Sequence, residues 1–173
     1  MSGTSQSRWK KQLSASEGYL MLEMPQHALD ALASVETNQD NLFSILLQRG
    51  LIHRHLHEFG RALEFLEQAE QIRPNSIPLQ MALGWCYKRT DQLPRAIAAA
   101  EKAYKMAPQD PILLYNLACY WSLARDKTQM LSWLGRALRM NSGIKEMIPT
   151  ESDFDPYRND PDFVKMIADD NSP

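Results

Sequence analysis

Apolar residues along this chain recur at helical spacing, in pairs of amphipathic segments joined by short turns. The clearest pair lies between Ile77 and Asp110, where the apolar positions of both segments follow a period of about 3.6 residues. Pro108 closes the pair, because proline cannot extend a helix and the chain must turn there. The pattern predicts two packed helices in this stretch.

The pattern of this pair persists when the chain is shifted by 34 residues in either direction, without a gap. We therefore expect four repeats, at residues 9–42, 43–76, 77–110 and 111–144. Each first helix has a small residue at the point where helix backbones must approach to about 8–10 Å. These residues are Ser16, Gly50, Gly84 and Ala118. One helix pair cannot bury its apolar face alone, so the repeats are expected to stack.

The central pair resembles the tetratricopeptide repeat in its small, aromatic, alanine and closing proline positions. The residues that carry the resemblance are Leu83, Gly84, Tyr87, Ala96, Ala100, Ala103 and Pro108. The resemblance implies an all-α fold, a right-handed α-solenoid of about four helix-turn-helix repeats plus C-terminal capping helices. The second and third repeats fit best, whereas the fourth has Lys127 and Met130 where an aromatic residue and an alanine are usual.

The segments on either side of the repeats have different expected roles. Residues 1–8 are expected to be a disordered polar tail, and residues 145–173 a C-terminal cap and tail. An array needs such a cap because its last helix has an apolar face without a neighbour. Pro149 should end one short helix, and Asp160 with Pro161 should start another. This Asp-Pro-rich segment resembles the closing segment of many bacterial tetratricopeptide proteins.

Composition and charge narrow the classes of function. The chain has 173 residues, a net charge of −2 and 44% apolar residues, so it suits one domain and has no strong field for nucleic acid or anionic lipid. No apolar run approaches the ~20 residues that cross a bilayer, and the N-terminus shows no apolar signal-peptide region. We expect a cytoplasmic protein without a membrane partner, with Cys86 and Cys119 as buried thiols.

No catalytic, cofactor-binding or metal-binding pattern emerges from the sequence. His53 and His57 have the i, i+4 spacing of a helical zinc pair, but no cysteine or carboxylate at a supporting spacing completes the site. No phosphate loop or nucleophile elbow is present. We therefore expect no enzyme activity, no cofactor and no metal, and interpret the histidines as packed or solvent-facing.

In the tetratricopeptide family, the first helices line a concave groove that holds a peptide or a helix. By this resemblance, a set of first-helix positions faces the groove, with an apolar and aromatic floor and a basic edge. The predicted partner-binding residues are Leu47, Leu51, Arg54, Met81, Trp85, Lys88, Arg89, Tyr115 and Asn116. We expect an apolar or amphipathic protein segment with acidic flanks. Only Asn116 matches the carboxylate clamp of chaperone-binding relatives, so that kind of binding is not expected.

Several alternatives remain at this point. The chain could be an adaptor or a chaperone-like protein, or a structural subunit that associates with itself. A helical-repeat protein that binds nucleic acid would need a basic face and polar base-reading residues, which this groove lacks. The groove could also be open, or be covered by the chain's own C-terminal tail or by a second copy.

Overall fold

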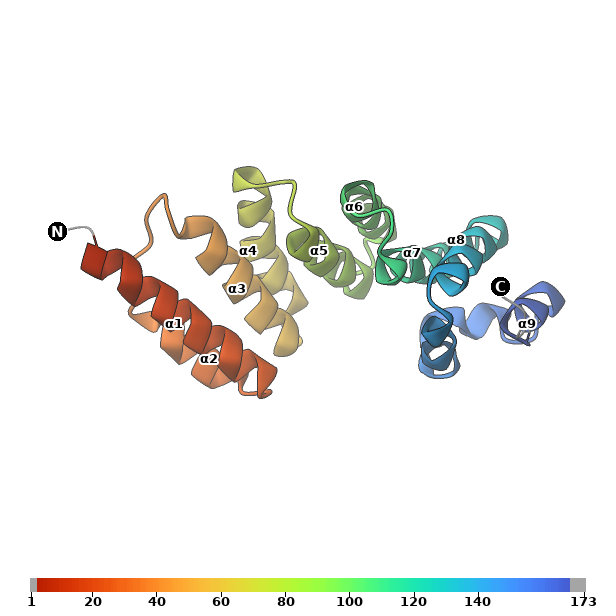
Figure 1. The fold of residues 1–173 in the computed structure, drawn as a ribbon, viewed down its shortest axis with the longest axis horizontal. Helices are drawn as coiled ribbons and strands as arrows, with labels where there is room; N and C mark the ends of the chain where they lie inside the picture. Colours follow the sequence, from red (N-terminus) through yellow and green to blue (C-terminus); the bar gives the residue numbers. More distant parts are fainter. Residues whose placement is uncertain (1–2, 169–173) are drawn as a thin grey trace. The chain divides into compact units, whose positions relative to one another are not determined.

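The computed structural model describes residues 3–168, and all regular elements within that range are helices (Figure 1). The all-α fold class is confirmed. The chain divides into two compact units, Met1–Thr90 and Asp91–Pro173. The N-terminal unit contains α1 (Gly3–Met21), α2 (Pro25–Ala33), α3 (Leu42–His55), α4 (Phe59–Ile72) and α5 (Ile77–Arg89). The C-terminal unit contains α6 (Leu93–Met106), α7 (Pro111–Leu123), α8 (Lys127–Met140), the 3₁₀ helices η1 (Ser142–Thr150) and η2 (Ser152–Tyr157), and α9 (Pro161–Ala168).

The turn inside each helix pair repeats the same backbone geometry. One residue of each turn adopts the left-handed conformation, with φ values of 57°, 58°, 58° and 61° at Glu23, His57, Asp91 and Arg125. Each of these positions is followed by the next after 34 residues. The N–H of Glu58 donates to the carbonyl of His53 at 2.9 Å, as in a Schellman helix ending. This recurrence confirms the predicted helix-turn-helix repeats, followed by C-terminal helices.

Small residues allow the helices of the N-terminal unit to pack closely. A Cβ atom placed on Gly50 would lie 2.5 Å from Cδ2 of Leu66, so a larger residue there would push α3 and α4 apart. The hydroxyl of Ser16 is buried and donates to the carbonyl of Ala28 at 2.9 Å, which joins α1 to α2. The four predicted crossing residues, Ser16, Gly50, Gly84 and Ala118, are all buried.

The last three helices cover apolar surface of the C-terminal unit, as expected for a cap. Their buried apolar side chains are Ile144, Ile148, Phe154 and Phe163, each at most 1% exposed. The carboxylate of Asp160 caps α9 by accepting from the N–H of Phe163 at 3.3 Å, and it pairs with Lys127 at 2.7 Å. Pro149 was expected to end a short helix, and it lies inside the 3₁₀ helix η1, which ends one residue later at Thr150.

The N-terminal end of the chain differs from the expectation. A disordered polar tail was expected at residues 1–8, but α1 begins at Gly3. No proline interrupts this stretch, so the helix that packs on α2 can extend through it. Residues 1–2 and 169–173 lie outside the described residues. The division between the compact units falls inside the predicted repeat 77–110, and the repeat boundaries stay a prediction. No helix between residues 3 and 168 is long and apolar enough to cross a membrane.

Candidate functional site

Two arginines and two aromatic rings lie together on the N-terminal unit. Trp85 and Phe59 pack edge to face, with ring centroids 5.2 Å apart. The guanidinium carbon of Arg89 lies 5.3 Å from the Phe59 ring centroid and 5.7 Å from that of Trp85. The guanidinium carbon of Arg54 lies 5.7 Å from the Trp85 ring centroid. We call Arg54, Phe59, Trp85 and Arg89 the arginine–aromatic cluster.

The helix ends position this cluster. Arg54 and Arg89 stand in the last turns of α3 and α5, where a positive charge is favoured by the partial negative charge of the helix C-terminus. Phe59 is the first residue of α4, two residues after the left-handed turn at His57. The ring centroids of His57 and Phe59 are 5.7 Å apart. The turn thus returns the chain so that an aromatic ring of α4 meets the ring of Trp85 on α5.

Neither guanidinium of the cluster has a polar partner within the described part of the chain. Among residues 3–168, Arg54 and Arg89 form no ion pair and no side-chain hydrogen bond. Arg89 is exposed and Arg54 is half-buried. A guanidinium carries five donors in a planar fork that matches a carboxylate, and stacking on an aromatic ring holds that fork in place with about 0.5–2 kcal/mol. The cluster therefore presents two oriented positive groups beside an aromatic floor.

The other predicted residues of the N-terminal unit lie on the same two helices. Leu47 and Leu51 on α3, and Met81 on α5, are half-buried, and these helices contact each other. Lys88 is also half-buried, and it already interacts within the chain. The structure therefore brings Arg54, Trp85 and Arg89 into one cluster, while the remaining residues supply partly exposed apolar surface on α3 and α5.

Phe59 is the residue of this site that sequence reasoning missed. It opens a second helix, whereas the family resemblance assigns the groove to first helices. The available signal was its place two residues after His57, since the turn is short enough to return Phe59 toward the end of α3. Its contact with Trp85 depends on tertiary packing, which no local pattern displays.

Tyr115, a predicted anchor on α7, is buried within the C-terminal unit. Its side chain is 2% exposed, and its ring packs against Phe154 of η2 with centroids 5.8 Å apart. The hydroxyl of Tyr115 has no hydrogen-bond partner among the described residues. Burial is the main cause that raises the pKa of this hydroxyl, and the neighbouring Cys119 thiol and the Glu151 and Asp153 carboxylates raise it further. Asn116, its neighbour, is half-buried on the same helix.

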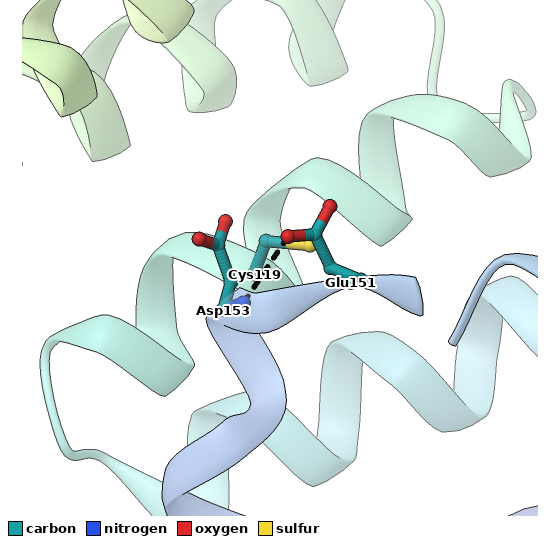
Figure 2. Close-up of side chains that lie close together, drawn as sticks. All are labelled: Cys119, Glu151 and Asp153. Atoms are coloured by element: carbon teal, nitrogen blue, oxygen red, sulfur yellow. Dashed lines mark hydrogen bonds between the residues drawn. The ribbon is translucent and has the colours of Figure 1, made fainter. Parts of the chain in front are cut away.

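The C-terminal segment contacts α7 through one thiol and two carboxylates (Figure 2). Cys119, Glu151 and Asp153 each offer a ligand atom, and these atoms lie within 4.8 Å of one another. The amide N–H of Asp153 donates to the Glu151 carboxylate at 3.1 Å. A structural zinc site has four protein ligands, and this group has three. We interpret the group as the packing contact of the segment, and the absence of a metal stays a prediction.

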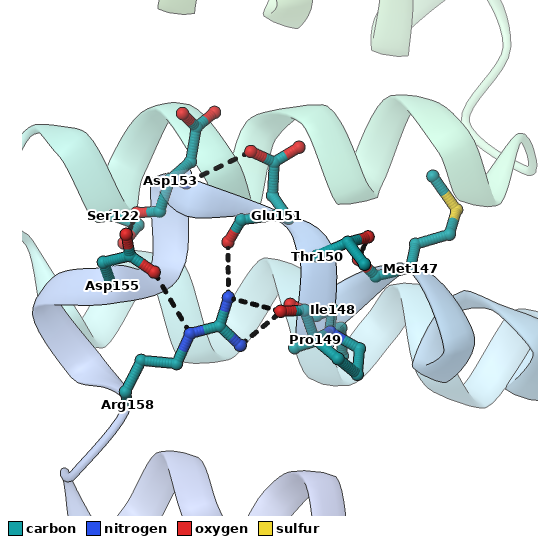
Figure 3. A network of polar contacts seen from close by, with 9 residues as sticks. All are labelled: Ser122, Met147, Ile148, Pro149, Thr150, Glu151, Asp153, Asp155 and Arg158. Atoms are coloured by element: carbon teal, nitrogen blue, oxygen red, sulfur yellow. Dashed lines mark hydrogen bonds and ion pairs between the residues drawn. The ribbon is translucent and has the colours of Figure 1, made fainter.

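Arg158 fixes the shape of the same segment (Figure 3). Its guanidinium donates to the backbone carbonyls of Ile148, Pro149 and Glu151, at 2.9, 3.1 and 2.8 Å. The hydroxyl of Ser122 on α7 donates to the carbonyl of Asp153 at 2.7 Å and is fully buried. The segment is therefore folded on itself by one arginine and attached to α7 by a buried hydrogen bond.

The remaining candidate groups have packing roles. His53 is buried, lies 2.6 Å from the carboxylate of Glu58 and stacks on Phe65, in agreement with a packed histidine. Its hydrogen bond holds the pKa of Glu58 below the usual value. Cys86 and Cys119 are buried free thiols, as predicted. Burial raises the pKa of Cys86 to about 11, against the opposing charge of Arg54, so this thiol stays protonated at neutral pH.

Comparisons with known proteins agree with this architecture. Residues 54–117 match the family model described as tetratricopeptide repeat. No curated protein matches the chain in sequence. The crystal structure of MamA is similar to this fold, with a TM-score of 0.65 and 16% sequence identity over 79% of this chain and 80% of that chain. At this identity the likeness concerns the fold alone. The tetratricopeptide fold is typically a scaffold for protein interaction rather than an enzyme, and residues 54–117 of this chain match the tetratricopeptide repeat family.

Proposed function

We propose that this protein is an adaptor that binds a protein segment at the arginine–aromatic cluster. The segment is a peptide or a helix that is apolar or amphipathic and has acidic residues beside its apolar part. The observation that carries the proposal is the pair of guanidinium groups of Arg54 and Arg89, which lie against the ring of Trp85 and have no polar side-chain partner among residues 3–168. Positive groups that the described residues leave without an ion pair fit a ligand that brings carboxylates.

The residues of the surface have different roles in this proposal. Trp85 is the anchor, because large aromatic side chains dominate the energy of protein interfaces. Leu47, Leu51 and Met81 supply half-buried apolar surface around it. Arg54, Arg89 and the predicted Lys88 set the orientation of the partner and speed its association more than they increase affinity.

Tyr115 and Asn116 remain predicted partner-binding residues on the C-terminal unit. A partner would reach the ring of Tyr115 only after the C-terminal segment leaves α7, because Phe154 now packs on that ring. Asn116 is half-buried and keeps some surface for contact. We therefore place the primary site on the N-terminal unit.

The test is a crosslinking pull-down from the native host with the whole chain and with the double variant Trp85→Ala, Arg89→Glu. Circular dichroism first establishes that the double variant is folded. A protein that the natural chain captures and the folded variant loses would support the proposal. Equal capture by both chains would contradict it and would move the binding surface away from the cluster.

Self-association is a second candidate function, favoured by one observation. Met21 and Leu22, at the end of α1, are 87% and 69% exposed, which is unusual for large apolar side chains that stand together. A molecular mass that rises with protein concentration in light scattering, and falls again in Met21→Ser, Leu22→Ser, would favour this candidate over the adaptor.

A further inference from the structure

The chain itself supplies an occupant for one first-helix face. In the C-terminal unit, residues 151–157 lie against α7 and contact three of its side chains. Phe154 packs on Tyr115, the carboxyl side chains of Glu151 and Asp153 lie beside Cys119, and the carbonyl of Asp153 accepts from Ser122. This occupant is a short 3₁₀ segment, with one buried aromatic residue between acidic neighbours.

The same positions exist on α5 of the N-terminal unit. A shift of 34 residues relates Tyr115, Cys119 and Ser122 to the α5 residues Met81, Trp85 and Lys88. Both helices also start and end in the same register, since α5 is Ile77–Arg89 and α7 is Pro111–Leu123. The face of α5 that carries Trp85 is therefore the counterpart of the face on which the C-terminal segment lies.

The chemistry of the α5 face suits the same kind of segment better than the α7 face does. Where α7 has the small, neutral Cys119 beside two carboxyl groups, α5 has the ring of Trp85 with Arg54 and Arg89 stacked against it. An aromatic side chain can pack on the rings of Trp85 and Phe59 in an edge-to-face arrangement. Carboxylates on either side of it would then form charge-assisted hydrogen bonds with guanidinium groups that have no ion-pair partner in the described part of the chain.

We infer that the arginine–aromatic cluster binds a partner-protein segment in which an aromatic residue stands between acidic residues, as Phe154 does between Asp153 and Asp155. This inference rests on the proposed function and narrows its partner to one chemical class. The apolar residue occupies the floor formed by Trp85 and Phe59, and the flanking carboxylates pair with Arg54 and Arg89.

The probe is a fluorescent synthetic peptide with the sequence of residues 150–159, added to the whole chain and followed by fluorescence anisotropy. Peptides with Phe154→Ala, or with Asp153→Asn and Asp155→Asn, serve as matched controls. We expect binding to the natural chain that weakens about 10-fold or more with the alanine peptide, because the anchor is lost. The asparagine peptide should bind more weakly, and salt should weaken the natural peptide more than the asparagine peptide.

Variants of the chain show where the peptide binds. Trp85→Ala, and separately Arg54→Gln with Arg89→Gln, should reduce peptide binding about 10-fold, whereas Ser122→Ala should leave it unchanged. Loss of binding in Ser122→Ala with full binding in Trp85→Ala would overturn the inference, because the peptide would then exchange with the segment on α7. If the cluster instead binds Phe154 of a second copy of this chain, the face serves self-association. This outcome would also overturn the inference.

The two proposals can fail separately. If the peptide does not bind, but a captured partner is still lost in the Trp85→Ala, Arg89→Glu variant, the adaptor function stands and the acidic–aromatic class is overturned. Tighter binding of a leucine- and glutamate-rich amphipathic helical peptide than of the natural peptide would likewise leave the adaptor function standing and overturn the acidic–aromatic class. If the peptide does not bind and the partner is captured equally by the natural chain and by the double variant, both proposals fail.

Discussion

The first helices α5 and α7 occupy the same place in successive repeats, yet their faces differ in what covers them. On α7, Tyr115 and Cys119 are 2% and 3% exposed beneath the chain's own segment. On α5, Met81 and Trp85 are half-buried, and two arginines without an ion pair within residues 3–168 stand beside Trp85. At the position where α7 has the small side chain of Cys119 beneath the C-terminal segment, α5 has the larger indole ring of Trp85, with two arginines against it. Side-chain size at this position thus sets how closely a segment can pack on the backbone of the helix.

The largest expected effect comes from removing the occupant of the α7 face. Phe154 is fully buried, and Phe154→Ala should lower the free energy of unfolding of the C-terminal unit by about 3–5 kcal/mol, as for other buried phenylalanines. Urea unfolding measures this loss. Val164→Ala is the matched control, because Val164 is 43% exposed and its loss should change stability by less than about 0.5 kcal/mol. Equal effects of the two changes would mean that Phe154 does not hold the segment.

The next effect concerns binding rather than stability. Trp85→Ala should weaken partner affinity by about 2 kcal/mol or more, roughly 30-fold, while unfolding changes less because the side chain is half-buried. Trp133→Ala is the control, since Trp133 also packs against an arginine, with the Arg136 guanidinium carbon 4.5 Å from its ring centroid. That arginine already donates to the hydroxyl of Tyr104. An equal affinity loss in both variants, measured by calorimetry, would remove the distinction between the two clusters.

A third change introduces tryptophan, the residue of α5 at position 85, at the corresponding position 119 of α7. Cys119→Trp should overfill the space under the C-terminal segment and destabilise the C-terminal unit by about 1–3 kcal/mol. Hydrogen exchange should then show faster exchange in residues 144–157. Cys119→Ala, which keeps a small side chain, should keep most of the protection. Full protection in the tryptophan variant would show that side-chain size at this position does not decide whether the face is closed.

The smallest expected effect is a difference in acid sensitivity between the two units. The hydrogen bond from Lys127 holds the pKa of Asp160 below its ordinary value of 3.8. A carboxyl with a lowered pKa in the folded state stabilises at pH above its ordinary value, and this contribution is lost as the pH falls through the folded-state pKa. Asp160→Asn should therefore flatten the loss of stability of the C-terminal unit on acidification below about pH 4.

Glu58→Gln is the matched change in the N-terminal unit, where the hydrogen bond to His53 lowers the pKa of Glu58 from its ordinary 4.5. It should flatten the acid response of that unit and leave α9 unaffected. Urea midpoints from pH 7 downward measure both responses. An unchanged acid response of the C-terminal unit in Asp160→Asn would contradict the assignment of that response to the Lys127 pair.

The repeat period made the helices and their crossing residues predictable, because close packing demands small residues such as Gly50 at fixed spacing. The arginine–aromatic cluster was predictable in part. Trp85, Arg54 and Arg89 follow from the family pattern, but Phe59 joins them only through a tertiary contact. The contact of Asp153 with α7 could not be predicted from the repeat pattern, because Asp153 lies in a segment outside the repeats. The left-handed turns also have no shared side chain, as Glu23, His57, Asp91 and Arg125 show.

The hold of Arg158 on three carbonyl groups has a consequence for how the C-terminal segment opens. Because one guanidinium ties Ile148, Pro149 and Glu151 together, these residues cannot leave one at a time without breaking the same set of hydrogen bonds. The segment should therefore release α7 in a single all-or-none step and behave as one cooperative foldon. The α7 face would then alternate between fully closed and fully open populations, with no gradual series of partly uncovered states.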